Sequence, residues 1–170
     1  MMKNIMLGIM ILLITLPNAY AEQHELNVRD KIAIVEVMNK YALGIDSKNY
    51  DLYKSIFIKN VEVKLLYDKG LLNENEVIIK GANNWVDYVE VAISRYRNTQ
   101  HMLGNPLISY ENEIAKVRTD LQALHYYKEF PNRYRIVWGY YITHMKKENN
   151  EWKIIKHSLT TIGARIEESG

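Results

Sequence analysis

Three polar residues interrupt otherwise apolar segments of this chain and could together move protons. Asp46 ends the apolar stretch that begins at Tyr41, and His101 and His125 lie in later segments that alternate apolar and polar residues. A carboxylate and two imidazoles in an apolar cavity change one another's pKa through burial and charge. Such a cluster can act as general acid and base near neutral pH. We therefore take these residues as the candidate active site.

Strand alternation places both histidines in apolar rows. His101 shares one strand face with Leu103 and Asn105. On the following strand, the residues that share a face are Leu121, Ala123, His125 and Tyr127. A buried polar side chain without a hydrogen-bond partner costs about 1–3 kcal/mol. A histidine that is hydrogen-bonded in the core avoids this cost without catalysis, so a purely structural role stays open for each imidazole.

Asp46 ends a helical pattern and needs a partner of its own. A buried carboxylate without a donor becomes protonated, so a nearby histidine would hold its charge. Alternatively, Asp46 caps a second helix, a role that Ser47 or Asn49 could fill equally well. Tyr41 and Asp46 are five residues apart, about 140° around a helix axis. They therefore converge only if the helix end near Gly44 is distorted.

The elements that must position these residues follow from periodicity. Apolar spacings of three and four predict helices over residues 28–45, 50–57 and 81–96, with Asn27 as the first cap. Period-two alternation predicts strands over residues 61–67 and 76–80, and then hairpin strands near 100–110, 114–129, 134–147 and 152–165. This order is typical of an α+β domain whose curved sheet packs helices against its concave face around an apolar interior.

The other histidines and the common motifs add little. We expect His144 and His157 to face outward or lie at hairpin ends, and His24 to lie near the new N-terminus that cleavage would create. The sequence has no HExxH, GxSxG or Gly-rich phosphate loop, and no cysteine. Thiol catalysis and disulfides are thereby excluded. A metal held by two histidines and one carboxylate remains an alternative, because a facial triad has that ligand count.

The first residues are typical of an export signal. They combine a positive residue (Lys3), an apolar run over residues 5–16 and the small-x-small site Ala19-Tyr-Ala. Cleavage of residues 1–21 would leave residues 22–170 as a single exported domain, periplasmic or extracellular, without stable membrane insertion. An uncleaved anchor is the alternative, but the run is shorter than the roughly 20 residues that span a bilayer. The net charge of +2, without a basic stripe, gives no indication of nucleic-acid binding.

Three segments resemble a known family. They are the one from Tyr41 to Asp46, the Thr99-Gln-His-Met-Leu-Gly-Asn-Pro segment and the Trp152-Lys-Ile-Ile-Lys-His segment. Over nearly the whole mature chain, the sequence resembles the SnoaL-like family of the nuclear transport factor 2-like superfamily. It is similar there to scytalone dehydratase and the bile-acid 7α-dehydratases. The resemblance implies a cone-shaped fold, with a curved antiparallel sheet packed on three N-terminal helices around a cavity.

The same resemblance assigns roles to individual residues. Asp46 and His101 match the cavity aspartate and the histidine of the TxH segment, and His125 matches a histidine on the following strand. Tyr41 matches the catalytic tyrosine five residues before the aspartate. The chain differs from scytalone dehydratase at Ile45, which replaces a tyrosine, and at two further positions. Leu65 aligns near a substrate-holding tyrosine of that family, for which Tyr67 is a substitute. Tyr141 falls near a position where the family has an asparagine. The expected substrate-binding residues are Tyr67, Asn105, Tyr127 and Tyr141.

These observations predict a cofactor-independent lyase, such as a dehydratase, or an isomerase acting on a small apolar hydroxy-carbonyl compound. His101, oriented by Asp46, would remove the proton beside the carbonyl, Tyr41 would donate to the enolate oxygen, and His125 would protonate the departing hydroxyl. The alternative is a non-catalytic exported protein that binds a ligand or partner in the same cavity. The exposed sheet face, with Tyr110, Tyr126 and Trp138 as candidates, makes a homodimer the expected assembly.

Overall fold

The computed structural model describes residues 26–67 and 76–168. The expected signal peptide and its cleavage site lie outside these residues. The described elements are α1 (Val28–Asp46), α2 (Tyr50–Ser55), β1 (Phe57–Leu66), β2 (Glu76–Lys80), α3 (Ala82–Ile93), β3 (Tyr96–Glu111), β4 (Ile114–Tyr127), β5 (Arg133–Glu148) and β6 (Glu151–Glu168). None of the helices in the described ranges is long and apolar enough to cross a membrane.

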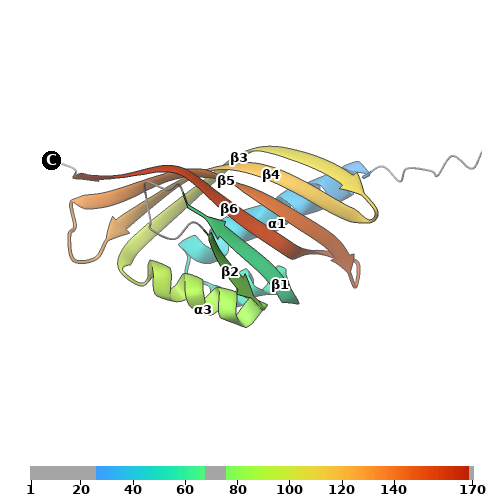
Figure 1. Cartoon of the computed structure of the whole chain (residues 1–170), viewed down its shortest axis with the longest axis horizontal. Coiled ribbons are helices and arrows are strands. Elements are labelled where there is room, and N and C mark those ends of the chain that lie inside the picture. Colours follow the sequence, from blue (N-terminus) through green and yellow to red (C-terminus); the bar gives the residue numbers. More distant parts are fainter. Residues whose placement is uncertain (1–25, 68–75, 169–170) are drawn as a thin grey trace, which may run out of the picture.

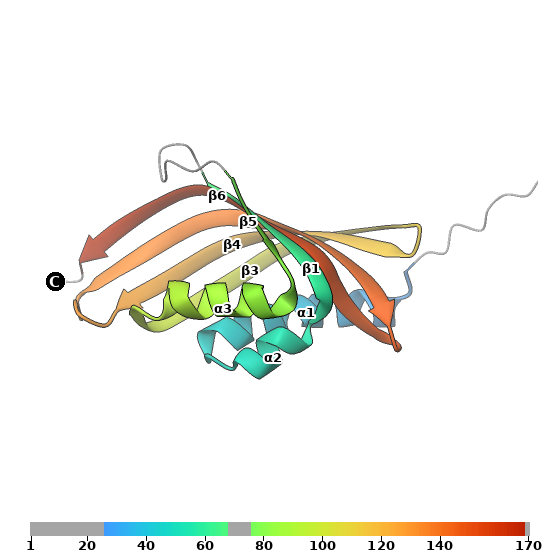
Figure 2. The same ribbon diagram turned by 60° about the horizontal axis from the view of Figure 1, so that its bottom comes forward.

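The six strands form one curved sheet in the order β2-β1-β6-β5-β4-β3, which arches over the helices (Figures 1 and 2). The hairpins β3–β4, β4–β5 and β5–β6 are antiparallel, as the alternation predicts. β1 pairs with β2 in antiparallel and with β6 in parallel orientation. Only α1 and α2 precede the sheet in the chain, because α3 is inserted between β2 and β3. The three expected helices are present, and the third, expected over residues 81–96, is α3, so two of the three lie before the first strand.

Two asparagine caps define the helix starts. The Asn27 side chain accepts a hydrogen bond from the backbone N–H of Asp30 (2.9 Å) at the start of α1. The Asn49 side chain does the same for Leu52 (3.0 Å) at the start of α2. Such caps satisfy N–H groups that have no partner within the helix. Because Asn49 caps α2, Asp46 is not needed for that role and its carboxylate can point elsewhere.

Gly44 allows α1 and α2 to pack closely. A Cβ atom at this position would lie 2.8 Å from the Cβ of Tyr53 and 2.9 Å from its Cα. Those distances are shorter than van der Waals contact allows. Tyr53 is fully buried and its ring packs on Tyr41 and Phe57 at centroid distances of 4.9 and 5.2 Å. The absence of a side chain at Gly44 therefore lets the aromatic core form under the C-terminal half of α1.

His157 is fully buried in the core, so the expectation that it faces outward is wrong. The physical reason is a bulge: the β5–β6 register shifts between His144 and Met145, which pair with Lys156 and Ile154. The extra residue, Ile155, reverses the alternation along β6. Trp152 and Ile154 face inward before the bulge, and His157 and Thr161 face inward after it. His144 alternates with buried neighbours and is half-buried.

Candidate active site

Asp46 and His101 make a two-point contact between the end of α1 and β3. One carboxylate oxygen of Asp46 lies 2.7 Å from Nδ1 of His101, and the other accepts the His101 backbone N–H at 2.8 Å. The Thr99 hydroxyl also donates to Asp46, at 2.8 Å. The side chains of His101 and Asp46 are 8% and 22% exposed. The carboxylate thus fixes both the ring and the main chain of His101.

This contact keeps Asp46 ionised and determines which ring nitrogen of His101 carries the hydrogen. Burial acts to raise the pKa of the Asp46 carboxyl, but the hydrogen bonds and charge of His101, with the Thr99 hydroxyl, outweigh it and lower this pKa. An ionised carboxylate only accepts hydrogen bonds, so Nδ1 of His101 must donate. The second ring nitrogen, Nε2, is then the one available to a ligand, because the partner at one nitrogen fixes the role of the other. Neutral His101 therefore carries a basic nitrogen at the pocket.

His125 lies beside His101 but has different electrostatics. The two ring centroids are 5.5 Å apart with the planes at 82°. Burial, followed by the charges of His101 and Arg135, lowers the pKa of His125 to about 4. His125 is therefore neutral at pH 7, and it can offer an N–H donor but not an imidazolium. This changes the role that the sequence predicted for it, because a neutral ring is a weak general acid.

Tyr41 and Tyr141 form the apolar floor beside these histidines. Their ring centroids are 5.2 Å apart, and each lies 4.7 Å from the ring of His157. Burial raises the pKa of both phenols well above the ordinary value of 10. Both hydroxyl groups therefore stay protonated and can donate hydrogen bonds. α1 is helical through Asp46, and within the described residues no hydrogen bond joins Tyr41 to Asp46.

These side chains meet at a pocket of about 300 Å³ between α3, the end of α1 and the concave face of the sheet. Of the expected residues, Tyr41, Tyr67, His101, His125 and Tyr141 line it, whereas Asp46 lies behind His101. The Tyr67 hydroxyl lies 3.3 Å from that of Tyr88 on α3. The apolar part of the lining comes from Ile45, Leu65, Trp85, Val89, Ala92, Ile93, Leu121, Ala123, Val137 and Leu159.

Two expected substrate-binding residues do not line this pocket. Asn105 is exposed, has φ +51° at a break in the β3–β4 register, and donates to the Asp120 carboxylate at 2.9 Å. The break ends the row that Asn105 was expected to share with His101. The Tyr127 ring contacts the Tyr96 ring in a tilted arrangement, with the centroids 5.0 Å apart, and Tyr127 lines an adjoining groove. Its position is the outer end of the His125 row.

Sequence reasoning missed two arginines in the lining, Arg95 and Arg135. Arg135 pairs with His125 across β4 and β5. Its position two residues before Val137 was a usable signal, since period-two alternation puts both on the same face. The described residues hold no cluster of three or more His, Cys, Asp or Glu side chains that could bind a metal. The facial-triad alternative therefore has no ligand set in that part of the chain.

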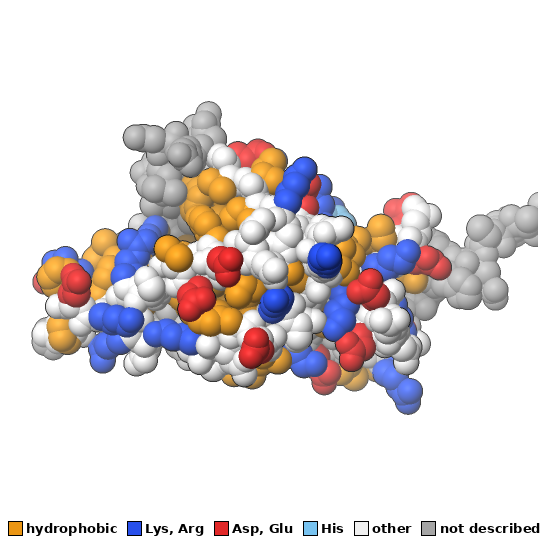
Figure 3. Space-filling model, turned by 90° about the horizontal axis from the view of Figure 1, so that it is seen from below, with side chains coloured by type: hydrophobic (Ala, Val, Ile, Leu, Met, Phe, Trp, Pro, Cys, Tyr) orange, Lys and Arg blue, Asp and Glu red, His pale blue; other side chains and the backbone are white. Residues whose placement is uncertain are grey.

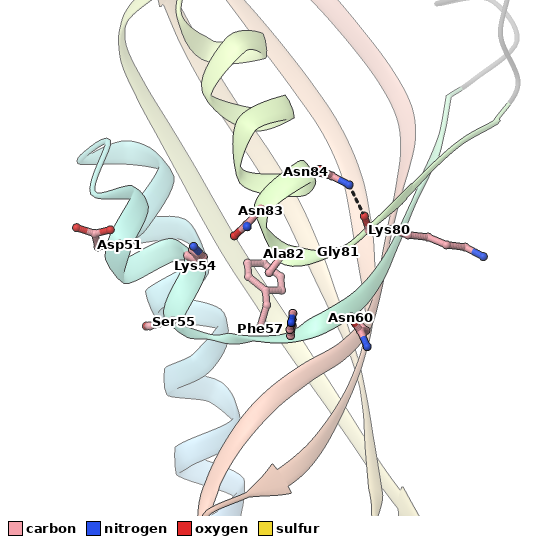
Figure 4. A pocket seen from close by; sticks show the side chains of 11 residues that line it. Asp51, Lys54, Ser55, Phe57, Asn60, Lys80, Gly81, Ala82, Asn83 and Asn84 are labelled. Atoms are coloured by element: carbon pink, nitrogen blue, oxygen red, sulfur yellow. Dashed lines mark hydrogen bonds between the residues drawn. The ribbon is translucent and has the colours of Figure 1, made fainter.

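A larger cleft of about 1010 Å³ lies between α2, β1 and the start of α3 (Figure 4). It is lined by side chains such as Lys54, Asn60, Lys80 and Asn83, and Asn84 donates to the Lys80 carbonyl at 2.9 Å. Its polar side chains lie at the surface, and no histidine is among them. The smaller pocket is the better candidate, because it combines apolar walls with titratable groups whose pKa values are shifted.

Comparisons with known proteins agree with this architecture. A family model described as the SnoaL-like domain matches residues 27–157. A protein from Novosphingobium aromaticivorans, provisionally assigned as a scytalone dehydratase, superposes with a TM-score of 0.70 at 21% identity, covering 85% of this chain and 91% of that one. Hexachlorocyclohexane dehydrochlorinase LinA-type3 from Novosphingobium barchaimii gives 0.69 at 16% identity, with coverages of 82% and 90%. No curated protein sequence matches significantly. At these identities the structural matches establish a shared fold.

Proposed function

This chain belongs to the SnoaL-like domain family, and we propose that it is a cofactor-independent lyase or isomerase of small apolar hydroxy-carbonyl compounds. The observation that carries the proposal is the double contact of Asp46 with His101. The carboxylate lies 2.7 Å from Nδ1 of the ring and accepts the backbone N–H at 2.8 Å. A histidine held in this way presents one basic nitrogen at a fixed position. The pocket around it is mainly apolar.

His101 acts as the base in the proposed reaction. Its Nε2 accepts the proton on the carbon beside the substrate carbonyl, and the electrons move into an enolate. The ionised Asp46 stabilises the imidazolium that results, because opposite charges at hydrogen-bond distance favour the charged form. Positioned acid–base groups of this kind contribute about 10²–10⁴-fold to a rate. The enolate electrons then form the carbon–carbon double bond and expel hydroxide from the neighbouring carbon. The hydroxide takes the proton held by the His101 imidazolium, which gives an enone and water and restores neutral His101.

Tyr41 and His125 serve the two oxygens of the substrate. Tyr41 remains protonated, because burial raises its pKa well above 10, and its hydroxyl donates to the enolate oxygen. His125, neutral at pH 7, donates a hydrogen bond to the departing hydroxyl instead of transferring a proton from an imidazolium. Tyr67 and Tyr141 bind the substrate body. The similar proteins include one provisionally assigned as a dehydratase and one dehydrochlorinase, and both names describe eliminations.

The test is dehydration of a panel of apolar β-hydroxy ketones, followed by enone absorbance, with deuterium uptake at the α-carbon as a second readout. Wild-type protein should catalyse at least one of these reactions. Asp46→Asn and His101→Ala should each lower turnover by about 10² or more, with the double variant little worse. His144→Ala, at a half-buried histidine on the other face of the sheet, is the matched control and should retain activity.

Full turnover in folded His101→Ala protein would contradict the proposal. So would binding of these ketones without deuterium uptake or enone formation in wild-type protein. That second outcome would support the alternative of a non-catalytic binding protein, in which the same pocket holds a ligand.

The proposed setting is outside the cytoplasm, as a homodimer. Cleavage after Ala21 should give an exported protein whose N-terminal sequence begins at Glu22, and an intact Met1 in the exported fraction would refute it. The proposed dimer contact is the outer sheet face, where the Tyr126 and Tyr134 ring centroids are 5.5 Å apart and Arg165 lies over Trp138. Light scattering should give twice the chain mass, and Trp138→Glu should halve it.

A further inference from the structure

The pocket contains two cations in otherwise apolar or aromatic surroundings. Arg95 and Arg135 both line it, and the lining within the described residues includes no Asp or Glu. For neither guanidinium does a carboxylate lie within ion-pair distance in the ranges 26–67 and 76–168. Arg135 is half-buried, whereas Arg95 is exposed at the edge of the pocket. The half-buried charge of Arg135 is unfavourable without a counterion unless something else supplies the negative charge. A ligand is the natural source.

Arg135 stands at the outer end of a row that leads into the pocket. It pairs directly with His125 across β4 and β5, so both side chains lie on the concave face. Two and six residues further along β5, Val137 and Tyr141 line the same pocket, and Tyr141 is only 2% exposed. Along this strand face, the pocket lining therefore changes from the charged Arg135 at the opening, through the aliphatic Val137, to the buried phenol of Tyr141.

Arg95 lines the same pocket from the side of α3, opposite the sheet. It follows the C-terminal end of α3, and its guanidinium lies over the Tyr96 ring at 5.4 Å. Both arginines act on Tyr127: burial, the largest effect, raises the pKa of this phenol, and the charges of Arg135 and Arg95 act to lower it. The charges of both guanidinium groups thus act on the same side of the pocket opening, next to Tyr127.

The surroundings of the mouth are also basic. Figure 3 shows Lys and Arg side chains gathered at the left end of the helix-covered face, where β5 begins and β6 ends. The groove that adjoins the pocket contains Lys128 and Glu129 together with Arg95. A positive end of this kind draws anions toward the opening and raises their rate of association.

We propose that the ligand of this pocket is an amphipathic anion, with an apolar body directed toward Tyr141 and a carboxylate or similar group bound between Arg95 and Arg135. Guanidinium groups bind carboxylates through paired, charge-assisted hydrogen bonds. The substrate class of the proposed reaction is then a hydroxy-carbonyl acid rather than a neutral ketone. That consequence rests on the proposed function, whereas the anion site itself does not.

A matched pair of fluorescent probes tests the anion site without any substrate. 8-Anilinonaphthalene-1-sulfonate and N-phenyl-1-naphthylamine share an apolar body, and only the first is charged. The sulfonate should bind wild-type protein at least 10-fold more tightly, and raising NaCl from 50 to 500 mM should weaken only the sulfonate. Arg135→Gln should weaken sulfonate binding about 10-fold, as expected for one lost charge-assisted bond, and leave the neutral probe within twofold.

Three further variants make the result specific. Arg135→Lys should restore part of the sulfonate affinity, because it keeps the charge, and Arg95→Gln with Arg135→Gln should weaken it further. Arg29→Gln, at an exposed arginine in the first turn of α1, is the control and should change neither affinity. Equal affinity of wild-type protein for both probes, or equal loss of both in Arg135→Gln, would overturn the proposal.

The two proposals fail in different ways. Anion selectivity that persists in His101→Ala protein supports the anion site whether or not the protein catalyses a reaction. Turnover of neutral β-hydroxy ketones, unchanged in Arg135→Gln, would retain the proposed function and refute the acidic substrate. Among substrates, a hydroxy-keto acid and its methyl ester should differ mainly in KM, and Arg135→Gln should remove that difference.

Discussion

The buried His157 should make the protein unstable toward acid in a way that one substitution removes. Burial lowers the pKa of His157 to about 3 from an ordinary value of 6.5. The folded state therefore keeps the ring neutral, while the unfolded chain binds a proton below pH 6.5. Because the unfolded state binds more protons, the free energy of unfolding falls as the pH falls from about 6.5 to 3.

The magnitude follows from the two pKa values. Each pH unit inside the window costs about 1.4 kcal/mol, so His157 alone should remove about 2 kcal/mol of stability between pH 7.5 and 5. His125, with a pKa of about 4, should remove a similar amount over the same interval. A domain with a total stability of about 5–15 kcal/mol would show such losses clearly.

The perturbation is His157→Asn, whose side chain can still bond Thr143, which lies 2.9 Å from Nδ1 of His157. Urea unfolding followed by tryptophan fluorescence at pH 7.5, 6 and 5 gives the free energy of unfolding. The variant should lose about 2 kcal/mol less than wild type between pH 7.5 and 5. His144→Asn is the comparison: burial also lowers the pKa of this half-buried histidine, but less than that of His157, so its replacement should reduce the pH dependence by less. The same pH dependence in His157→Asn and wild type would refute the reasoning, whatever the stability at pH 7.5.

Two further substitutions test the packing that supports the site. Gly44→Ala should lower the free energy of unfolding by about 2 kcal/mol, the scale of overpacking, because its Cβ would lie 2.8 Å from that of Tyr53; thermal unfolding that matches wild type would contradict this. Asp30→Asn should cost about 1 kcal/mol in urea unfolding, since Asp30 pairs with Lys147 at 2.6 Å and accepts the Trp152 indole N–H at 3.0 Å. High salt should reduce the loss of stability that Asp30→Asn causes, because it screens the ion pair with Lys147. A loss that does not depend on salt would instead come from the hydrogen bond to the Trp152 indole alone.

Local periodicity predicted the type and order of the elements. The α1 pattern and the three hairpins follow from spacings of three and four and then of two, which the folded chain keeps. The boundaries moved where tertiary pairing prevailed: Phe57 opens β1 instead of ending α2, and Tyr96 opens β3 instead of ending α3. The parallel pairing of β1 with β6 joins distant segments, so no local pattern could indicate it.

Bulges account for the residues that were misplaced. Alternation assigns faces correctly only while the strand register is continuous. The register breaks after Gly104 and again at Ile155, so Asn105 leaves the His101 row and His157 turns into the core. The first break contains Gly104 and Pro106, which typically mark bulges in strands, whereas no proline or glycine marks the second break at Ile155. Polar residues in apolar segments indicated Asp46 and His101 as a cluster, and the family resemblance matched them to a cavity aspartate and histidine. No local pattern could fix the geometry of their contact, because 55 positions separate them along the chain.

The bond between Asp46 and the His101 backbone N–H has a consequence for protein engineering. Because the main chain of β3 is fastened to α1 at this point, the position of the imidazole does not depend on the bulk of the other pocket walls. Leu121, Val137 and Leu159 could therefore be exchanged for larger or smaller apolar residues to admit different molecules. A library restricted to those wall positions would explore new specificities while the reactive nitrogen stays where it is.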